Sequence, residues 1–214
     1  MKYAITGIVA ASLMLNGCTK GPALPSENAD AAEMCYAAQA KALEGTTGKL
    51  PAKTALGPLA YFSVLAVKSR AGGKPGMADF QKFAKGDDVK AKYAKTEHLT
   101  DALPECMKRF PLADAETKVT LPTDEGERNA VCFYTAAYAT GKVENDNVDT
   151  DAVTQKAASY YKITQDPSNP MLMSIATKYN VTNADDGVRL AADTIGRSTD
   201  LGNLYSILSA CPSP

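Results

Sequence analysis

Apolar residues recur along this chain mostly at helical spacing, and little of it alternates with the period of two that a half-buried strand requires. Most segments are rich in alanine and carry charges at i, i+3 and i+4, as amphipathic helices do. The pattern predicts helices in the first half over 30–44, 54–70, around Phe80 and Phe83, and over 90–110. It predicts helices in the second half over 123–140, 151–164, 171–179 and 184–210. The pattern therefore indicates an all-α protein.

Local signals set the expected ends of these helices. Asp30 is placed to cap the first helix, and Gly45 to end it. Pro104 lies inside the segment 90–110 and predicts a kink or a fresh helical start there. In the last segment we expect a break near Gly196 or Gly202.

The N-terminus departs from this pattern. Met1–Lys2 precedes an apolar run of mostly small residues from Tyr3 to Leu15, which together match the cationic start and hydrophobic region of an export signal. Leu15-Asn16-Gly17-Cys18 follows, and a cysteine directly after Leu-x-Gly resembles the lipobox of bacterial lipoproteins. The resemblance covers fewer than 20 residues. It implies that residues 1–17 are removed and that fatty chains on Cys18 anchor the protein to a membrane.

Two other fates of this N-terminus remain as alternatives: plain secretion after a cut further on, and a retained anchor helix. A membrane-spanning helix needs about 20 apolar residues, and Asn16 ends this run earlier. Thr19 follows the cysteine, at the position where an aspartate in lipoproteins often marks retention in the inner membrane. The resemblance therefore implies the outer membrane, facing the periplasm.

The two halves of the chain repeat a pattern centred on cysteine. An aromatic residue directly follows Cys35 and Cys132, and alanines lie five and seven residues after each. Leucines lie seven and three residues before Cys106 and Cys211. The matched positions are few, so chance is the alternative, but the pattern favours a duplication. We therefore predict two related helical units in tandem, each of about four helices.

Cysteine usage agrees with export. With Cys18 set aside, an even number of cysteines remains, which in an oxidising compartment indicates two disulfides. Four cysteines allow three pairings. If the halves are duplicates, each closes its own loop, which favours Cys35–Cys106 and Cys132–Cys211. Each bridge would then tie the opening helix of a unit to its closing helix.

These signals divide the chain into five segments. Residues 1–17 form the signal peptide and 18–29 a lipidated tether. Residues 30–111 form the first helical repeat, 112–122 the linker and 123–214 the second repeat.

The formal net charge is −1, which gives no global attraction to nucleic acid. Charge is unevenly spread, because Glu27–Pro111 has 13 basic and 10 acidic residues whereas Leu112–Pro214 has 8 and 14. This asymmetry either helps the halves dock or reflects two unrelated solvated surfaces.

Signatures of catalysis and metal binding are mostly missing from the sequence. The single histidine, His98, lies in a polar run and is expected on a solvated helix surface. The cysteines are too far apart for a zinc knuckle, and no cofactor is expected. The acidic stretch Glu144–Asp151 fails the calcium-loop pattern, so we expect Asp149 or Asp151 to cap the next helix instead.

Three weaker features remain as candidates for ligand binding. Asp87-Asp88 and Asp185-Asp186 form one carboxylate pair in each half, the residue type that a glycosidase-type site needs, although such pairs more often stabilise helix starts. Exposed tyrosines bind saccharides, but Tyr134 and Tyr138 have the helical spacing of half-buried core, and Tyr160-Tyr161 is a further possibility. A series of lysines indicates a solvated face or, as the sharper alternative, an anionic partner; it comprises Lys82, Lys85, Lys90, Lys92 and Lys95.

The sequence therefore predicts a non-catalytic envelope lipoprotein that presents a disulfide-stapled helical surface to an envelope protein, as an adaptor, inhibitor or immunity factor would. The alternative is a protein that binds cell-wall glycan or a small ligand, with hydrolase chemistry at the paired aspartates as a variant of it. The two interpretations differ in what the structure should contain. A partner surface requires an exposed apolar patch of several hundred Å². A ligand site requires a concave pocket with converging polar groups.

Lipid attachment at Cys18 is directly testable. The variant Cys18→Ser lacks the thiol that is acylated, so we expect the protein to move from the membrane fraction to the soluble fraction. Cell fractionation followed by immunoblotting measures this, with Thr19→Ser as the control that keeps the cysteine. Unchanged membrane partitioning of Cys18→Ser would contradict the lipoprotein interpretation.

Overall fold

The computed structural model describes residues 21–84, 87–145 and 147–214, so the signal peptide and Cys18 lie outside the described residues. Its first half contains α1 (Asn28–Leu43), α2 (Ala52–Thr54), a π-helical turn (Ala55–Leu59), α3 (Ala60–Arg70), α4 (Met77–Ala84), α5 (Asp87–Tyr93), a 3-10 turn (Leu99–Ala102) and α6 (Leu103–Arg109). A 3-10 turn (Pro111–Ala113) leads to α7 (Glu125–Asn145), α8 (Ala152–Lys162), a 3-10 turn (Ile163–Gln165), α9 (Pro170–Tyr179), α10 (Ala184–Ser198) and α11 (Leu204–Ala210). The predicted all-α class is confirmed: in the described ranges the β structure consists of one isolated bridge between Leu50 and Val148.

Helix α1 matches the predicted first helix except at its start. It begins at Asn28, and Glu27 occupies the cap position without a side-chain hydrogen bond. Asp30 therefore lies in the first turn instead of capping the helix, where its charge still complements the helix dipole. Past the other end, Gly45 has a φ of 85°, the left-handed conformation that glycine adopts without strain.

The predicted helix 54–70 is interrupted. Gly57 has non-helical dihedral angles (φ −80°, ψ −113°), which separate the turn that begins with α2 from the continuous helix α3. The cause is Pro58, because a proline ring disfavours helical geometry in the residue before it. The sequence analysis did not anticipate this break.

The other two long predicted helices also divide. The segment 90–110 becomes α5, a 3-10 turn and α6, with Pro104 in the first turn of α6, where its missing N–H costs nothing. The segment 184–210 divides between α10 and α11, close to Gly202. Asn203 caps α11, since its side-chain oxygen accepts a hydrogen bond from the Ser206 N–H at 2.9 Å.

Both predicted disulfides are confirmed. Cys35 on α1 pairs with Cys106 on α6, with their Cα atoms 5.7 Å apart. Cys132 on α7 pairs with Cys211, the residue that follows α11, at 5.8 Å. Each bridge joins the opening helix of one half to its closing helix and lies in a buried cluster of that half.

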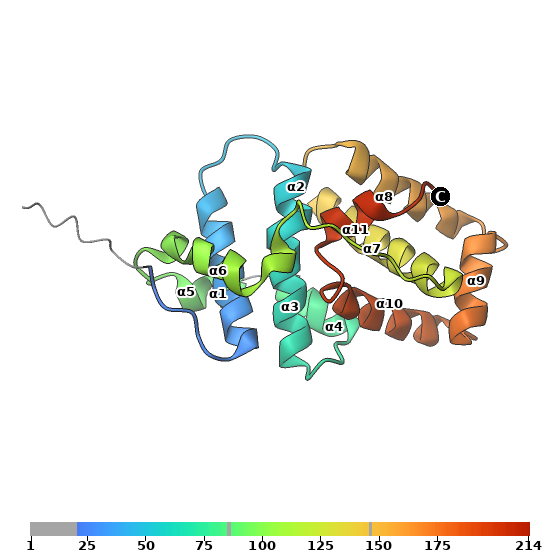
Figure 1. The fold of residues 1–214 in the computed structure, drawn as a ribbon, viewed down its shortest axis with the longest axis horizontal. Helices are drawn as coiled ribbons and strands as arrows, with labels where there is room; N and C mark the ends of the chain where they lie inside the picture. Colours follow the sequence, from blue (N-terminus) through green and yellow to red (C-terminus); the bar gives the residue numbers. More distant parts are fainter. Residues whose placement is uncertain (1–20, 85–86, 146) are drawn as a thin grey trace, which may run out of the picture.

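Helix α3 lies between the two halves (Figure 1), and hydrophobic clusters cross from one half to the other. One face of α3 packs against α1, where Phe62 is completely buried, and another packs against α10. There Val64 and Val67 form a cluster with Ile195. Leu56, which precedes α3, is buried with residues of α7, α8 and α11. Two of the buried hydrophobic clusters therefore contain residues from both sides of the predicted boundary between the repeats.

Polar contacts also join the halves. Lys68 on α3 lies 2.6 Å from the Asp200 carboxylate, and Lys53 pairs with Glu116. In both pairs the base comes from the basic first half and the acid from the acidic second half, as expected if the charge asymmetry helps docking. The fully buried Asn203 donates hydrogen bonds to backbone carbonyls of the linker region, at 3.1 Å to Leu112 and 2.7 Å to Asp114.

The described part of the chain includes no helix that is both long and apolar enough to cross a bilayer.

The bridges close loops with sequence separations of 71 and 79 residues, for which the chain-entropy argument gives about 4 kcal/mol each. We expect Cys132→Ser/Cys211→Ser to lower the free energy of unfolding by about that amount in urea titrations. The matched double variant Cys35→Ser/Cys106→Ser should lose a similar amount because its loop is nearly as long. A loss below about 1 kcal/mol for both would contradict this account.

Candidate functional site

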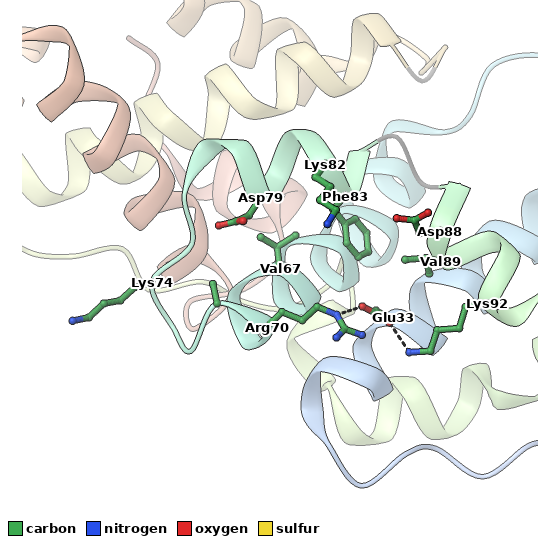
Figure 2. A pocket seen from close by; sticks show the side chains of 11 residues that line it. Glu33, Val67, Arg70, Lys74, Asp79, Lys82, Phe83, Asp88, Val89 and Lys92 are labelled. Atoms are coloured by element: carbon green, nitrogen blue, oxygen red, sulfur yellow. Dashed lines mark hydrogen bonds and ion pairs between the residues drawn. The ribbon is translucent and has the colours of Figure 1, made fainter.

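A pocket opens between α1, α3, α4 and α5, in the first half of the chain (Figure 2). Its volume is about 620 Å³, within the range of small-molecule sites. We call it the basic pocket, and its lining combines apolar side chains with four cations and three carboxylates: Glu33, Val67, Arg70, Ala71, Lys74, Asp79, Lys82, Phe83, Asp88, Val89 and Lys92.

The floor of the basic pocket is a buried carboxylate. Glu33 on α1 has a side chain that is 5% exposed, so its charge must be matched by nearby cations. Arg70, the last residue of α3, donates through Nε to Oε1 of Glu33. Lys92 on α5 donates through Nζ to Oε2 at 2.8 Å. Both carboxylate oxygens of Glu33 are therefore held from opposite sides, as the dashed lines in Figure 2 show.

Asp30, one turn before Glu33 on α1, completes what we call the ion network: Asp30, Glu33, Arg70 and Lys92. Its Oδ1 accepts from Arg70 Nη2 at 3.1 Å and from Lys92 Nζ at 2.7 Å. Tyr93 adds a hydrogen bond from its hydroxyl to the Asp30 carbonyl at 3.1 Å. The network therefore ties the three helices α1, α3 and α5 together at the pocket floor.

Charge pairing outweighs burial in this network. Burial by itself would raise the pKa of Glu33, but the hydrogen bonds from Arg70 and Lys92 and their positive charges hold that pKa below its ordinary value. Burial would likewise lower the pKa of Lys92, and the hydrogen bonds to Asp30 and Glu33 instead raise it. All members of the network are therefore charged at neutral pH.

The walls and mouth of the pocket differ in character. Val67, Phe83 and Val89 supply apolar surface, and Figure 2 shows Lys82 beside Phe83 with its amine turned toward the cavity. Neither Lys82 nor Lys74 forms an ion pair with any described residue, but the Lys74 side chain points away from the cavity in Figure 2, which leaves Lys82 as the cation open to a ligand.

The acids of the wall are less available. Asp79 accepts a hydrogen bond from the Gly76 N–H at 2.8 Å, close to the start of α4. Asp88 is exposed on α5, and Figure 2 places it across the cavity from Arg70. Among the described residues, two lining cations, Lys74 and Lys82, and two lining carboxylates, Asp79 and Asp88, therefore have no ion pair.

The structure separates the two predicted aspartate pairs. Asp88 lines the basic pocket, whereas Asp87 begins α5 and its side chain lies outside the described residues. Asp185 and Asp186 lie in the first turn of α10 and do not line this pocket. Asp186 accepts from the Thr182 hydroxyl at 2.9 Å and from Arg189 at 2.9 Å. These local bonds lower its pKa and give it the helix-start role that such pairs commonly have.

His98 is exposed as expected but is not on a helix. It has a φ of 52°, in the left-handed region, and it precedes the 3-10 turn at Leu99. Its Nδ1 lies 3.6 Å from the Asp101 carboxylate. His98 also lines a second pocket of about 520 Å³ between α1 and α5, together with mostly small residues such as Ala37 and Ala94.

The tyrosines and Asp151, which the sequence also singled out, serve in the core or as a helix cap. Tyr134 and Tyr138 are half-buried, which confirms their core assignment, and the buried Tyr160 donates its hydroxyl to the Pro212 carbonyl at 2.7 Å. Asp151 caps α8 as predicted, accepting from the backbone N–H of Val153 and of Thr154.

Only some of the lysines in the predicted series form a solvated face. Lys92 belongs to the ion network and Lys82 to the pocket wall, while Lys90 and Lys95 are exposed. Lys85 lies outside the described residues. Within the described ranges, no group of three or more His, Cys, Asp or Glu side chains is arranged to hold a metal ion.

Sequence reasoning missed Glu33 and Arg70, the two residues that form the pocket floor. The signal for Glu33 was present, because it interrupts the otherwise apolar run from Ala31 to Ala38, all of which is buried. A glutamate on such a face requires a cation from another helix. Nothing in the spacing identifies Arg70 as that partner, because it lies 37 residues further along the chain.

Comparisons of this chain with known protein families, with curated proteins and with solved structures each find no match.

The ion pairs of Glu33 predict a pH-dependent stability. Because its folded-state pKa lies below the ordinary 4.5, the pairs stabilise the fold at neutral pH, and this stabilisation is lost as the pH falls below 4.5. We expect Glu33→Gln to lower the free energy of unfolding by about 1–3 kcal/mol at neutral pH, less than for a fully buried pair, because both cations are partly exposed.

Urea titrations at neutral pH and at about pH 3 measure the effect, since the wild type and Glu33→Gln should converge in acid. Glu44→Gln is the control, because its pair with Lys41 is exposed on both sides. A deficit of Glu33→Gln that is equal at both pH values would show that lost packing, and not lost charge pairing, causes it.

Proposed function

We propose that this protein is an envelope lipoprotein that binds a small organic anion in the basic pocket and does so without catalysis. The observation that carries the proposal is one cavity in which the cations Arg70, Lys82 and Lys92 lie beside apolar walls (Figure 2). The sequence left open a surface for a protein partner and a site for a ligand. A concave site with polar groups supports the ligand site.

The spare hydrogen-bond donors of the pocket favour an anionic group on the ligand. Glu33 has both oxygens engaged by cations that also line the cavity. A guanidinium has five N–H donors, and the bonds of Arg70 to Glu33 and Asp30 account for two of them. Lys82 adds an unpaired ammonium group at the wall. A carboxylate or phosphate group therefore finds donors that the protein itself does not use.

The apolar walls favour a ligand with a hydrocarbon or aromatic part. Val67, Phe83 and Val89 come from three helices and line the cavity beside the cations. Burial of apolar surface supplies most of the affinity in sites of this kind, and the charged groups fix orientation. A compact organic anion uses both features.

The chemistry of the lining supports binding over catalysis. No Ser, Thr, Cys, His or Tyr is among its described residues, so it offers no hydroxyl, thiol or imidazole group for catalysis. Of the four aspartates considered for hydrolysis, Asp88 lines the cavity, while Asp185 and Asp186 belong to the start of α10. We therefore propose a non-catalytic role for this pocket.

A protein partner is the second candidate, supported by exposed apolar side chains in the second half. Tyr161, Met173 and Val188 are each more than half exposed, on α8, α9 and α10 respectively. Three separate side chains are weaker support than a contiguous patch, because scattered exposed apolar residues are normal on protein surfaces.

Two further parts of the proposal come from the sequence. Lipid chains on Cys18 would hold the domain to the outer membrane, on its periplasmic side, by resemblance to the lipobox. Duplication of an ancestral helical unit would explain why each half opens with a cysteine-bearing helix and closes with its partner cysteine.

Ligand binding is tested with the purified lipidated protein in detergent and a panel of small carboxylates and phosphates that carry apolar groups, by calorimetric titration. We expect Lys82→Glu to weaken binding of any hit by about tenfold or more, which corresponds to 1.4 kcal/mol, because a donor becomes a like charge. Uncharged analogues of the hit should bind more weakly than the anion itself.

Lys162→Glu is the matched control, since Lys162 is exposed at the end of α8, outside the pocket. Equal weakening by both variants would point to non-specific attraction and contradict a site at the pocket. If no anion binds and envelope extract instead yields one stoichiometric protein partner, the second candidate replaces the first.

A further inference from the structure

The first described residues of the chain lie on the domain and do not extend away from it. Leu24 packs against the buried cluster that contains the Cys35–Cys106 bridge. Arg109, the last residue of α6, donates to the backbone carbonyl of Pro25 and, at 2.5 Å, to that of Ser26. A third bond from Arg109 reaches the Asn28 side chain at 2.8 Å. The segment is therefore held in place through main-chain atoms and an apolar anchor.

The contact begins at Gly21 itself. A Cβ atom on Gly21 would lie 2.5 Å from the backbone carbon of Asp101, which is closer than real contacts allow, so the backbone of Gly21 rests directly on the 3-10 turn before α6. Any side chain at this position would push the segment off the turn. The chain thus leaves the folded domain beside Asp101.

Covalent geometry then limits where Cys18 can be. It precedes Gly21 by three residues, and a chain spans at most about 3.6 Å per residue, so its Cα lies within about 11 Å of the Gly21 Cα. This bound holds whatever conformation residues 19 and 20 adopt. Fatty chains on Cys18 would enter a bilayer from that same short distance.

We propose that the end of the domain formed by α5, the 3-10 turn Leu99–Ala102 and α6 lies against the lipid bilayer. Figure 1 places α5 and α6 at one end of the long axis of the molecule and α9 at the other. The inference rests on the proposed lipidation of Cys18. It adds that the docked segment from Gly21 fixes the orientation, so that α9 is held away from the membrane.

The short link, not electrostatic attraction, sets this orientation. The exposed charges around the proposed membrane-facing end are of both signs: Lys90, Lys95, Glu97, Asp101, Glu105 and Lys108. A surface of mixed charge has little net attraction to anionic headgroups. The orientation is therefore expected to be the same on zwitterionic and anionic membranes and at low and high salt.

The orientation also places the basic pocket. Helix α5 forms both part of the proposed membrane-facing end and the pocket wall that carries Asp88, Val89 and Lys92. The exposed side chains Tyr161, Met173 and Val188 belong to α8, α9 and α10 of the second half. The ligand pocket is thus in the membrane-proximal half, and the exposed apolar residues are presented to the periplasm.

Tryptophan fluorescence tests the orientation, because the chain contains no Trp and a single substitution gives one signal. We compare Glu105→Trp on α6, where the side chain is 65% exposed, with Met173→Trp on α9, where the residue is 55% exposed. Each full-length lipidated variant is incorporated into phosphatidylcholine vesicles that carry a nitroxide on the lipid headgroup. We expect several-fold stronger quenching of Glu105→Trp than of Met173→Trp, unchanged by salt or by added anionic lipid.

A linker variant separates orientation from anchoring. Insertion of a flexible Gly-Ser segment of about 20 residues between Lys20 and Gly21 should abolish the difference in quenching while the protein still floats with the vesicles. Equal quenching of the two Trp variants without the insertion, or stronger quenching of Met173→Trp, would overturn the orientation. Failure of the wild type to float with vesicles would instead overturn lipidation at Cys18, which distinguishes the two proposals.

Discussion

The burial of α3 between the two halves is the constraint on which the rest of this structure depends. From Ala60 to Val67 nearly every side chain of this helix is buried, on the face toward α1 as well as on the face toward α10. Complete burial of a side chain such as Phe62 contributes about 2–3 kcal/mol. Because one helix serves both halves, their relative position is fixed by packing. The C-terminal end of α3 is thereby fixed as well, and it carries Arg70 to the pocket floor.

The ion network shows how a buried carboxylate can organise a site. Removing Glu33 from water is costly, and the two cations offset that cost only because α3 and α5 deliver them to its two oxygens. The same cations line the cavity and retain N–H donors that these bonds do not use. One arrangement therefore holds three helices together and leaves hydrogen-bond donors for a ligand. The site depends on the fold, because its members come from α1, α3 and α5 and are brought together only by packing.

The Cys35–Cys106 disulfide connects the proposed membrane anchor to the helices that form the pocket. The Cys35–Cys106 bridge fixes α6 to α1, and α6 in turn holds the segment Pro25–Ser26 through Arg109. A domain held this rigidly next to its proposed lipid attachment site presents a defined face to the bilayer. In the proposed arrangement the basic pocket lies close to the membrane, whereas α9 of the second half is held away from it.

Helical class, most helix positions and both disulfides could be predicted from the sequence, because helical periodicity, caps and the repeated pattern around the cysteines are visible in it. The break at Gly57 was missed although the sequence contains its cause, because Pro58 disfavours helical geometry in the residue before it. Tertiary structure alone decided that α3 is shared by both halves and that Glu33 meets Arg70 and Lys92. The physical reason is that burial and charge pairing act between residues far apart in the chain, whereas the sequence pattern records only which residues need a partner, not which partner they find.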